Sequence, residues 1–303
     1  MTSRFEKYLK NPYYAVGNYL FKRYPNLMPD EWFLKVMWKK CMGYKLDLKH
    51  PQTFNEKLQW LKLYDRNPLY IVLVDKYRVK QWVAEKIGER YVIPTLAVYN
   101  SVDKIDLDAL PDKFVLKCNH DSGSTIICND KSIFDLDAAK KKLAVSLKKN
   151  YFFDSREWPY KRVKRCIIAE KYMEDLSVDD VIDYKIMSFN GVVKCSFTCT
   201  NRRREGGLNV TFFDTNWNRL PFTRKYPADL NPIEKPVSYE LMVKLTQRLT
   251  EQLPFSRVDF YEIDGTPYFG EITLYPGAGF EPFDDKEWDY KLGTWIELPK
   301  KQR

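Results

Sequence analysis

The chain has 303 residues, of which 44% are hydrophobic and 16% aromatic, a composition typical of a packed globular protein and not of a disordered one. No apolar run reaches the roughly 18 to 20 residues of a membrane span, and residues 1–17 lack the apolar core of a signal peptide. The 6 Cys form no CxxC pair and the chain has 2 His, so we expect no zinc site, free thiols and a cytoplasmic location.

The net charge of +9 is concentrated in residues 140–165, which carry ten Lys or Arg against two acidic residues, a net of +8. Such a segment favours an anionic partner: polyphosphate, nucleic acid, an acidic polymer, or peripheral contact with an anionic inner membrane face. A solvated helix face is the alternative, because Lys140 to Lys149 alternate between Lys and Leu or Val in a helical way. No recognition-helix or RNP-type pattern supports a specific nucleic acid. Charge alone leaves the partner open.

The first part of the chain is predicted to be helical. Residues 1–50 read as short helices rich in aromatic residues. Thr53-Phe-Asn-Glu56 has the spacing of a capping box, so we expect a helix that begins after Thr53 and continues through Tyr64. A second helix is predicted from about Leu69 to Ile87, ending at Gly88.

The rest of the chain is predicted to be rich in strands. We expect two further helices, at 135–150 and 237–253. The Asn190-Gly191 pair is a strong hairpin signal. Helices followed by a strand-rich half predict an α+β protein with a layered sheet. The predicted strands cover residues 92–98, 113–118, 125–128, 165–172, 183–189 and 192–200.

A further hairpin, predicted at residues 257–273 around Asp264-Gly265, carries the most specific chemistry. Two carboxylates on neighbouring strands, with a guanidinium beside them, are suited to Mg²⁺ and nucleotide phosphates. Ordinary strand alternation places on one face Arg257, Asp259 and Tyr261 of the first strand, and on one face Phe269, Glu271 and Thr273 of the second.

The length of the hairpin loop decides whether those carboxylates converge. A two-residue turn would put Asp259 and Glu271 on opposite faces, whereas a three-residue loop with Gly265 in the left-handed conformation would bring them together. The metal hypothesis therefore predicts a loop of odd length. The alternative is an ordinary hairpin with charges on its solvent face.

Other nucleotide and catalytic motifs are missing. The sequence has no GxxxxGK[ST] and no GxGxxG, and neither His stands in a motif such as GxSxG. The loop from Lys117 to Ser124 could fold over phosphates through the backbone N–H groups of Ser122, Gly123 and Ser124, with Lys117 as a point charge. His120 in this loop could contact a ligand or be a simple turn residue. The loop gains weight because Lys76, the Glu170 strand and the Asp259/Glu271 hairpin occur in the same chain.

Seven segments in order along the chain resemble the ATP-grasp superfamily, and in particular its TupA-like branch, named for teichuronopeptide biosynthesis and found in bacterial surface-polysaccharide loci. The resemblance runs from about residue 53 to residue 298. The segments are Thr53-Phe-Asn-Glu-Lys57, Val74-Asp-Lys-Tyr77, Ile87-Gly-Glu-Arg-Tyr-Val-Ile-Pro94, Phe114-Val-Leu-Lys-Cys-Asn-His-Asp-Ser-Gly-Ser124, Asp183-Tyr-Lys185, Arg257-Val-Asp-Phe-Tyr261 and Phe269-Gly-Glu-Ile-Thr273.

The resemblance implies an α+β ATP-grasp fold, in which two α+β subdomains sandwich the nucleotide. It implies a helical N-terminal region over 1–70 and a catalytic region over 71–303, with a phosphate-loop subdomain at about 110–172 and a metal and substrate subdomain at 173–303.

The resemblance also implies a role for each site residue. Lys76, Lys117 and Lys185 would contact the phosphates of ATP, and Ser122, Gly123 and Ser124 would cover them. Glu170 and the backbone around Tyr172 would face the adenine, and Asp183 the ribose. Asp259, Glu271 and Thr273 would hold Mg²⁺, and Arg257 would steady the charge that develops at the acyl carbon.

Three features depart from the superfamily pattern. Many members have Asn where this chain has Thr273, and the phosphate loop has a single Gly. Arg202, Arg203 and Arg204 fit no superfamily consensus. These residues could bind an acidic acceptor or the γ-phosphate, or they could form a solvated loop.

The implied activity is that of an ATP- and Mg²⁺-dependent carboxylate–amine ligase. It would form an acyl phosphate and then an amide, with an acidic sugar or polysaccharide precursor, of the uronic acid type, and an amine as substrates. The alternatives are a glycosyltransferase of the same pathway and a sugar kinase that stops at phosphoryl transfer. Asp179-Asp180 and Asp284-Asp285 are only adjacent pairs and not the DxD-like motif that a glycosyltransferase would use.

Overall fold

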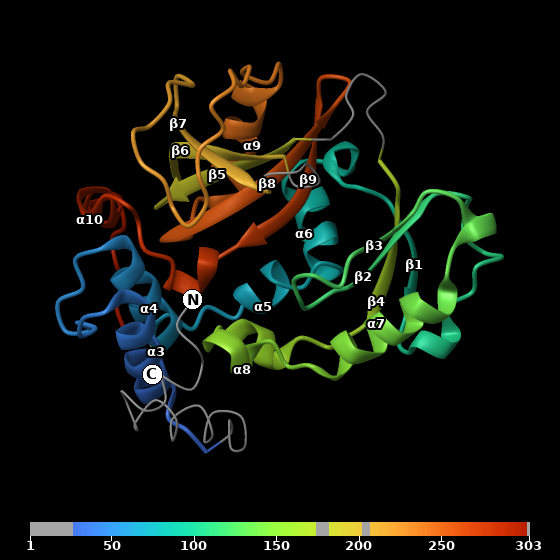
Figure 1. The fold of residues 1–303 in the computed structure, drawn as a ribbon, viewed down its shortest axis with the longest axis horizontal. Helices are drawn as coiled ribbons and strands as arrows, with labels where there is room; N and C mark the ends of the chain where they lie inside the picture. Colours follow the sequence, from blue (N-terminus) through green and yellow to red (C-terminus); the bar gives the residue numbers. More distant parts are fainter. Residues whose placement is uncertain (1–26, 174–181, 202–206, 302–303) are drawn as a thin grey trace.

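The computed structural model describes residues 27–173, 182–201 and 207–301, which form two lobes with a sheet in each (Figure 1). The smaller lobe has a four-stranded antiparallel sheet in the order β1-β4-β2-β3: β1 (Thr95–Tyr99), β2 (Phe114–Cys118), β3 (Ile126–Cys128) and β4 (Ile167–Lys171). The larger lobe has a five-stranded antiparallel sheet in the order β7-β6-β5-β8-β9: β5 (Asp183–Phe189), β6 (Val192–Thr200), β7 (Asn209–Asp214), β8 (Phe255–Ile263) and β9 (Thr266–Thr273). The predicted α+β class is confirmed.

The helices pack around these sheets and between them. On the larger lobe α9 (Tyr239–Thr250) packs against β5, β6 and β8, and α4 (Phe54–Tyr64) packs against α3 (Asp30–Met42) and α10 (Lys286–Thr294). On the smaller lobe α7 (Leu136–Lys148) packs against β2. The short helices α5 (Tyr70–Leu73) and α6 (Arg78–Ile87) lie between the lobes, and α8 (Phe152–Ser155) follows α7 (Figure 1). Across the described ranges, no helix has the length and apolarity needed to cross a bilayer.

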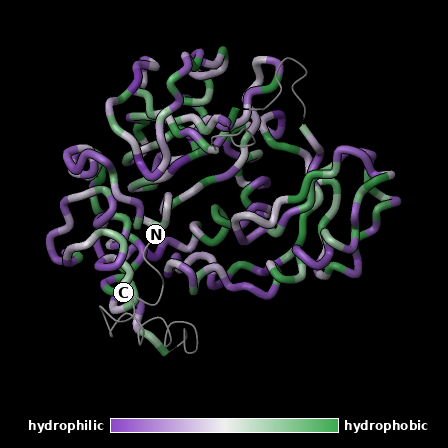
Figure 2. Tube along the Cα trace, in the orientation of Figure 1, coloured by the Kyte–Doolittle hydropathy of each residue, from purple (hydrophilic) through white to green (hydrophobic). Residues whose placement is uncertain are grey.

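Each lobe has its own hydrophobic core. The larger core joins α3, α4 and α9 to the five-stranded sheet, with Trp38, Phe54 and Phe255 all nearly inaccessible to solvent. The smaller core lies between the four-stranded sheet and α7, around Phe114 and Leu143. Figure 2 shows hydrophobic stretches along the strands of both sheets and hydrophilic stretches in the loops at the periphery. Because the cores are separate, the space between the lobes is available for polar groups.

The capping box at the start of α4 is confirmed. The Thr53 side chain accepts a hydrogen bond from the backbone N–H of Glu56 at 3.1 Å, and the Glu56 carboxylate accepts one from the backbone N–H of Thr53 at 3.1 Å. These two bonds satisfy backbone donors that the first turn of a helix leaves without partners.

The prediction of a single helix from Leu69 to Ile87 is wrong, because the helix is interrupted between α5 and α6. Asp75 Oδ1 accepts hydrogen bonds from the backbone N–H groups of Tyr77 (3.0 Å) and Arg78 (3.2 Å), which begins a new helix at Arg78. The backbone N–H of Lys76 donates to the carbonyl of Asn119 at 2.9 Å instead of continuing α5. The break holds the Lys76 backbone against the end of β2.

The hairpin of β8 and β9 differs from the prediction in its loop. Asp264 and Gly265 form a two-residue turn, both with positive φ (50° and 70°), between the paired residues Ile263 and Thr266. Such a turn matches the twist of the strands it joins. The predicted odd-length loop is therefore wrong.

Asp259 and Glu271 nevertheless lie opposite each other, because a β-bulge shifts the register between Asp259/Glu271 and Phe260/Phe269. Gly270 is the extra residue of the bulge, so the alternation of side chains along β9 is interrupted there while that along β8 continues. Strand alternation had predicted that Phe269 and Glu271 share a face, and this prediction is wrong. Phe269 is buried in the larger core with 1% exposure.

Candidate functional site

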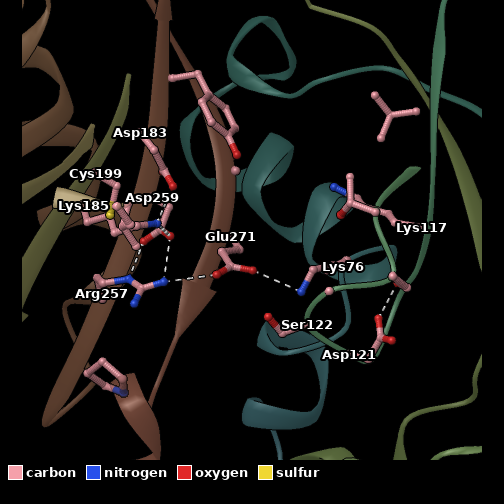
Figure 3. A pocket seen from close by; sticks show the side chains of 18 of the residues that line it. Lys76, Lys117, Asp121, Ser122, Asp183, Lys185, Cys199, Arg257, Asp259 and Glu271 are labelled. Atoms are coloured by element: carbon pink, nitrogen blue, oxygen red, sulfur yellow. Dashed lines mark hydrogen bonds and ion pairs between the residues drawn. The ribbon is translucent and has the colours of Figure 1, made fainter. Parts of the chain in front are cut away.

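A cleft of about 1070 Å³ lies between the lobes and is lined by residues of both sheets. Figure 3 shows its charged side chains facing one another across the open space. The structure brings into this lining most of the residues predicted from the sequence: Lys76, Lys117, Ser122, Gly123, Ser124, Glu170, Tyr172, Asp183, Lys185, Arg257, Asp259 and Glu271.

On the larger sheet, three neighbouring strands carry charged residues at one level. Lys185 of β5 pairs in register with Asp259 of β8, which pairs with Glu271 of β9. Lys185 Nζ contacts Asp259 and also Asp183, the latter at 2.7 Å. Because strand pairing sets this row, the rigid sheet and not a loop holds the charges in place.

Arg257 connects the two carboxylates of this row. Its Nε and Nη2 donate to Asp259 at 2.6 and 2.7 Å, and Nη2 also donates to Glu271 Oε1 at 3.1 Å. Burial raises the pKa of Asp259, and the charges of Arg257 and Lys185 oppose that effect. Burial would lower the pKa of Arg257, but Asp259 outweighs it and raises the pKa. The contacts fit an ionised Asp259 with its oxygens occupied by donors.

Glu271 also contacts a cation from the segment between α5 and α6. Its Oε2 lies 3.1 Å from Lys76 Nζ, so Glu271 stands between Arg257 and Lys76 (Figure 3). Burial would raise the pKa of Glu271, but Lys76 and Arg257 hold it well below its usual range. Burial lowers the pKa of Lys76, and the attraction of Glu271 reverses this into a net rise. Both groups are therefore charged at neutral pH.

On the smaller sheet, one carboxylate lies between two lysines. Glu170 of β4 is buried, with Oε2 at 2.5 Å from Lys117 Nζ and Oε1 in contact with Lys80 Nζ. Burial would raise the pKa of Glu170, but Lys117 and Lys80 lower it below its usual range. Burial dominates for Lys80 and lowers its pKa. Two cations share one anion, so this cluster carries one positive charge in excess.

Lys80 is a charged residue of this site that sequence reasoning missed. It lies on α6 beside Val79 and Val83, which are buried, and Lys80 itself is 9% exposed. Its Nζ also donates to the carbonyl of Ile93 at 2.8 Å. A lysine next to the apolar face of a predicted helix was the available signal, since such a residue needs an internal partner.

The loop predicted to cover phosphates has two parts with different roles. Ser122 and Gly123 are exposed, and Gly123 has a φ of 97°, a conformation that suits Gly. Ser124 is buried: its hydroxyl accepts from the backbone N–H of Cys118 at 2.9 Å and donates to Asp121 at 2.5 Å. The Ser124 hydroxyl therefore holds the loop in shape, and the exposed groups for a ligand are at Ser122 and Gly123.

The remaining predicted residues lie elsewhere. His120 is buried, with Nε2 3.1 Å from the carbonyl of Lys149, and burial lowers its pKa. Thr273 donates from its hydroxyl to Glu271 Oε1 at 3.3 Å. Neither is part of the cleft lining in the described ranges. Arg202 and Arg204 lie outside the residues that the structure describes.

The donor set fits Mg²⁺ held together with phosphates. Mg²⁺ is usually bound through one or two carboxylates plus substrate phosphates and not by an all-protein cage. Asp259 and Glu271 provide the two carboxylates. In the part of the chain that is described, no group of three or more His, Cys, Asp or Glu is placed to hold a metal by itself. Phosphate oxygens would have to complete the coordination.

Comparison with known proteins identifies the family. The model of the TupA-like ATP-grasp family matches residues 56–297, so the chain belongs to that family, as the sequence motifs had suggested. A search of curated proteins found no match.

Solved structures that resemble the chain include three synthetases. One is D-alanine–D-alanine ligase from Bacillus anthracis complexed with ATP: 15% identity, TM-score 0.38, covering 67% of this chain and 54% of that one. Another is L-amino acid ligase from Bacillus licheniformis: 14% identity, TM-score 0.43, covering 84% and 57%. The third is N5-carboxyaminoimidazole ribonucleotide synthetase from Thermus thermophilus: 12% identity, TM-score 0.41, covering 75% and 53%. The match thus spans little more than half the length of each, and at these scores the likeness carries no argument about activity.

Proposed function

We propose that this chain is an ATP- and Mg²⁺-dependent ligase that joins a carboxylate to an amine through an acyl phosphate, with an amide as product. Membership of an ATP-grasp family supports the proposal. The observation that carries it is the cleft in which Lys117 of the smaller sheet, which shares Glu170 with Lys80 of α6, faces the Asp259/Glu271 pair of the larger sheet. Paired lysines suit phosphates, and paired carboxylates suit a divalent cation.

ATP is proposed to lie between the two charged groups. Lys76, Lys80 and Lys117 would contact its phosphates, with the backbone of Ser122 and Gly123 covering them. Tyr172, which lines the cleft at the end of β4, and Glu170 would face the adenine. Asp183 is kept as the candidate for the ribose, although it contacts Lys185 in this structure.

Asp259 and Glu271 would hold Mg²⁺. Thr273, whose hydroxyl donates to Glu271, would orient this carboxylate or contact the ion itself. When bound, the ion would neutralise phosphoryl oxygens. Arg257, Lys185 and Lys76, which now contact these carboxylates, would then turn to phosphate oxygens. The cations keep the carboxylates ionised and in place until the nucleotide arrives.

The reaction follows from this arrangement. A substrate carboxylate oxygen attacks the γ-phosphorus, the bond to the β-bridging oxygen breaks, and ADP leaves. The amine then attacks the acyl carbon, loses a proton, and inorganic phosphate leaves with the former carboxylate oxygen. Arg257 and Lys185 would neutralise the charge that develops on the reacting groups, and positioning supplies most of the remaining rate enhancement. No covalent nucleophile from the protein is required.

The acid is proposed to be a uronic-acid-type sugar or precursor of a bacterial surface polysaccharide, handled in the cytoplasm. The exposed lysines and arginines of residues 140–165 support an acidic acceptor, since clusters of positive charge attract polyanions. Two members of the segment serve the fold instead. Arg156 is buried beside Asp30, and Arg165 donates to carbonyls at the end of α7, including that of Leu147 at 2.9 Å.

The direct test is release of ADP and phosphate from the purified chain with ATP, Mg²⁺ and a panel of uronic acids and amines. We expect release that requires both an acid and an amine, with an amide identified by mass spectrometry. ATP that binds without ADP release for any acid–amine pair would contradict the ligase proposal. A phosphorylated sugar formed without an amine would show a kinase instead.

A further inference from the structure

Beyond the residues proposed to hold the nucleotide and the metal, the cleft lining includes residues 224–226, Pro276, Gly277 and Glu281. In this part of the lining, Lys225 Nζ lies 2.8 Å from Glu281 Oε1. The two side chains are 49% and 25% exposed, whereas those of Lys185 and Asp259 are 8% and 2% exposed. The lining also includes the apolar residues Phe197, Cys199, Leu208, Val210 and Phe212, which are named here the apolar floor.

Glu281 differs from the other carboxylates that line the cleft in the described part of the chain. Asp121 accepts from Ser124, Glu170 is held by two lysines, and the three on the larger sheet are held by Lys185, Arg257 and Lys76. Glu281 pairs with a half-exposed lysine that can move into solvent at little cost. Its charge can therefore be transferred to a different cation without leaving a buried group unpaired.

The position of Glu281 is set by an unusual turn. A side-chain Cβ placed on Gly277 would overlap the Glu281 carboxylate, so the carboxylate rests directly on that glycine. Gly277, Ala278 and Gly279 all have positive φ (59°, 53° and 61°), which is unfavourable for Ala278. Backbone of this kind persists only when its surroundings enforce it, and it is concentrated at functional sites.

Buried groups beneath the turn enforce it. Lys62, which is 1% exposed, donates to the Ala278 carbonyl at 2.7 Å, and Gln59 donates to the Gly279 carbonyl at 2.7 Å. Arg224, also buried, donates to the backbone carbonyls of Glu281 (3.2 Å) and Pro276 (3.1 Å). Burial lowers the pKa of Arg224, and the charge of Arg257 adds to this effect. The turn is thus anchored by buried groups, and it lines the same cleft as Arg257.

We propose that Glu281 binds the ammonium group of the amine co-substrate, which replaces Lys225 as its counter-ion and then releases one proton to solvent, so that the neutral amine attacks. This inference rests on the proposed ligase function, in which the amine is the substrate that is positively charged in solution. Because the substrate ammonium replaces the Lys225 ammonium beside Glu281, the net charge around this carboxylate is unchanged. The apolar floor would contact the carbon skeleton of either substrate, and Arg257 lies beside it, over the Phe197 ring at 5.7 Å.

The test compares Glu281→Gln with the wild type, using an acid–amine pair that supports ADP release and, in parallel, hydroxylamine in place of the amine. Hydroxylamine is uncharged at neutral pH and attacks acyl phosphates, so it needs no ammonium site. We expect the KM for the amine to rise about ten- to a hundredfold. The KM for ATP and the hydroxylamine-dependent rate should change little.

Glu240→Gln is the matched control, because Glu240 pairs with Lys235 at 2.5 Å on the exposed surface of α9 and the substitution changes the net charge equally. It should leave all rates unchanged. An unchanged amine KM in Glu281→Gln would overturn the inference while the ligase function stands. Loss of the hydroxylamine reaction as well would also overturn it, since it would show a structural role.

A binding measurement separates this inference from a failure of the ligase proposal. Saturation-transfer NMR with ethanolamine requires no turnover, and Glu281→Gln should lose the signal that the wild type and Glu240→Gln retain. Equal signals from all three proteins, or no signal from the wild type, would contradict an ammonium site at Glu281. Failure of the ligase function would appear separately, as the absence of ADP release from the wild type with hydroxylamine and with every amine.

Discussion

The clusters of paired charges on the two sheets differ in net charge. On the smaller sheet, Glu170 is shared by Lys117 and by Lys80 of α6, so this cluster has one positive charge in excess. On the larger lobe, Asp183, Asp259 and Glu271 outnumber Lys185 and Arg257 by one. Lys76, from the break between α5 and α6, supplies the missing cation to Glu271.

This difference indicates what each lobe binds. Buried charges are costly unless they are paired, so each sheet balances most of its charge internally and leaves a small excess for a ligand. The positive excess suits phosphates, and the negative excess suits a divalent cation. Lys76 can serve either side, because it pairs with Glu271 now and could contact a phosphate later.

The largest effect is expected from Asp259→Asn. The substitution keeps the shape of the side chain and removes the charge that Arg257 and Lys185 share with the proposed metal. We expect kcat for ADP release to fall roughly 10²- to 10³-fold, with little change in the KM for ATP. The measurement is steady-state ADP release over a range of Mg²⁺ concentrations. If the variant kept the wild-type kcat, the assignment of Asp259 as a metal ligand would be contradicted.

Glu170→Gln should have its main effect on stability. It leaves Lys80 and Lys117, with side chains 10% and 16% exposed, without their anion, so the free energy of unfolding at pH 7 should fall by about 3 kcal/mol. The pKa of Glu170 is lowered on folding, so its contribution is present above its ordinary value of 4.5 and is lost as pH falls. Urea unfolding at pH 7, 5 and 3 should show a weaker acid dependence in the variant. If the variant had the same acid dependence as the wild type, the two lysines would not be lowering the pKa of Glu170 in the folded protein.

Lys117→Met should affect ATP binding and not the chemical step. Loss of one cation from the phosphate side is expected to raise the KM for ATP about ten- to a hundredfold, the range for a hydrogen bond to a charged group. The change in kcat should be smaller, which is the opposite division from Asp259→Asn. Lys244→Met, on the exposed surface of α9, is the control. If kcat fell and KM did not change, the assignment of the smaller lobe to phosphates would be contradicted.

The smallest effect is expected from Gly270→Ala at the bulge. A Cβ there would lie 3.2 Å from the Asp259 carbonyl oxygen and 3.2 Å from the Tyr261 ring, so we expect a loss of about 1 kcal/mol in stability. A several-fold lower activity should accompany it, because the bulge sets the position of Glu271. Gly265→Asn, in the turn of the same hairpin, should be tolerated since Asn accepts positive φ. Unfolding curves and ADP release measure both variants, and equal behaviour of the two would show that the bulge does not position Glu271.

Local signals were reliable where a few neighbouring residues decide the conformation. The capping box at Thr53 is present, and the strands on either side of Asn190-Gly191 have the predicted bounds. Six of the seven motifs that suggested the family contribute residues to the cleft lining, including Lys117, Asp259 and Glu271, and the exception is Thr53-Phe-Asn-Glu-Lys57. Strand β7 was not predicted, although Asn209–Asp214 contains the branched and aromatic residues that strands favour.

Signals failed where the partner is distant in the chain. The break before α6 depends on Asn119, whose side chain donates to Asp75 at 2.9 Å across 44 residues of sequence. Lys80 became part of the site only because β4 brings Glu170 against α6. The isolated Gly270 within a predicted strand was the available signal for the bulge, since such a glycine often marks one.

Most helices and strands, the position of the hairpin turn at Asp264-Gly265 and the kinds of charged group suited to ATP and Mg²⁺ could be predicted from local sequence. Which of these groups meet depends on the tertiary fold: a one-residue bulge places Asp259 opposite Glu271, and a helix break places Lys76 against Glu271. Local conformation follows from short-range sterics and hydrogen bonds. The pairing of buried charges, by contrast, depends on how separate elements pack.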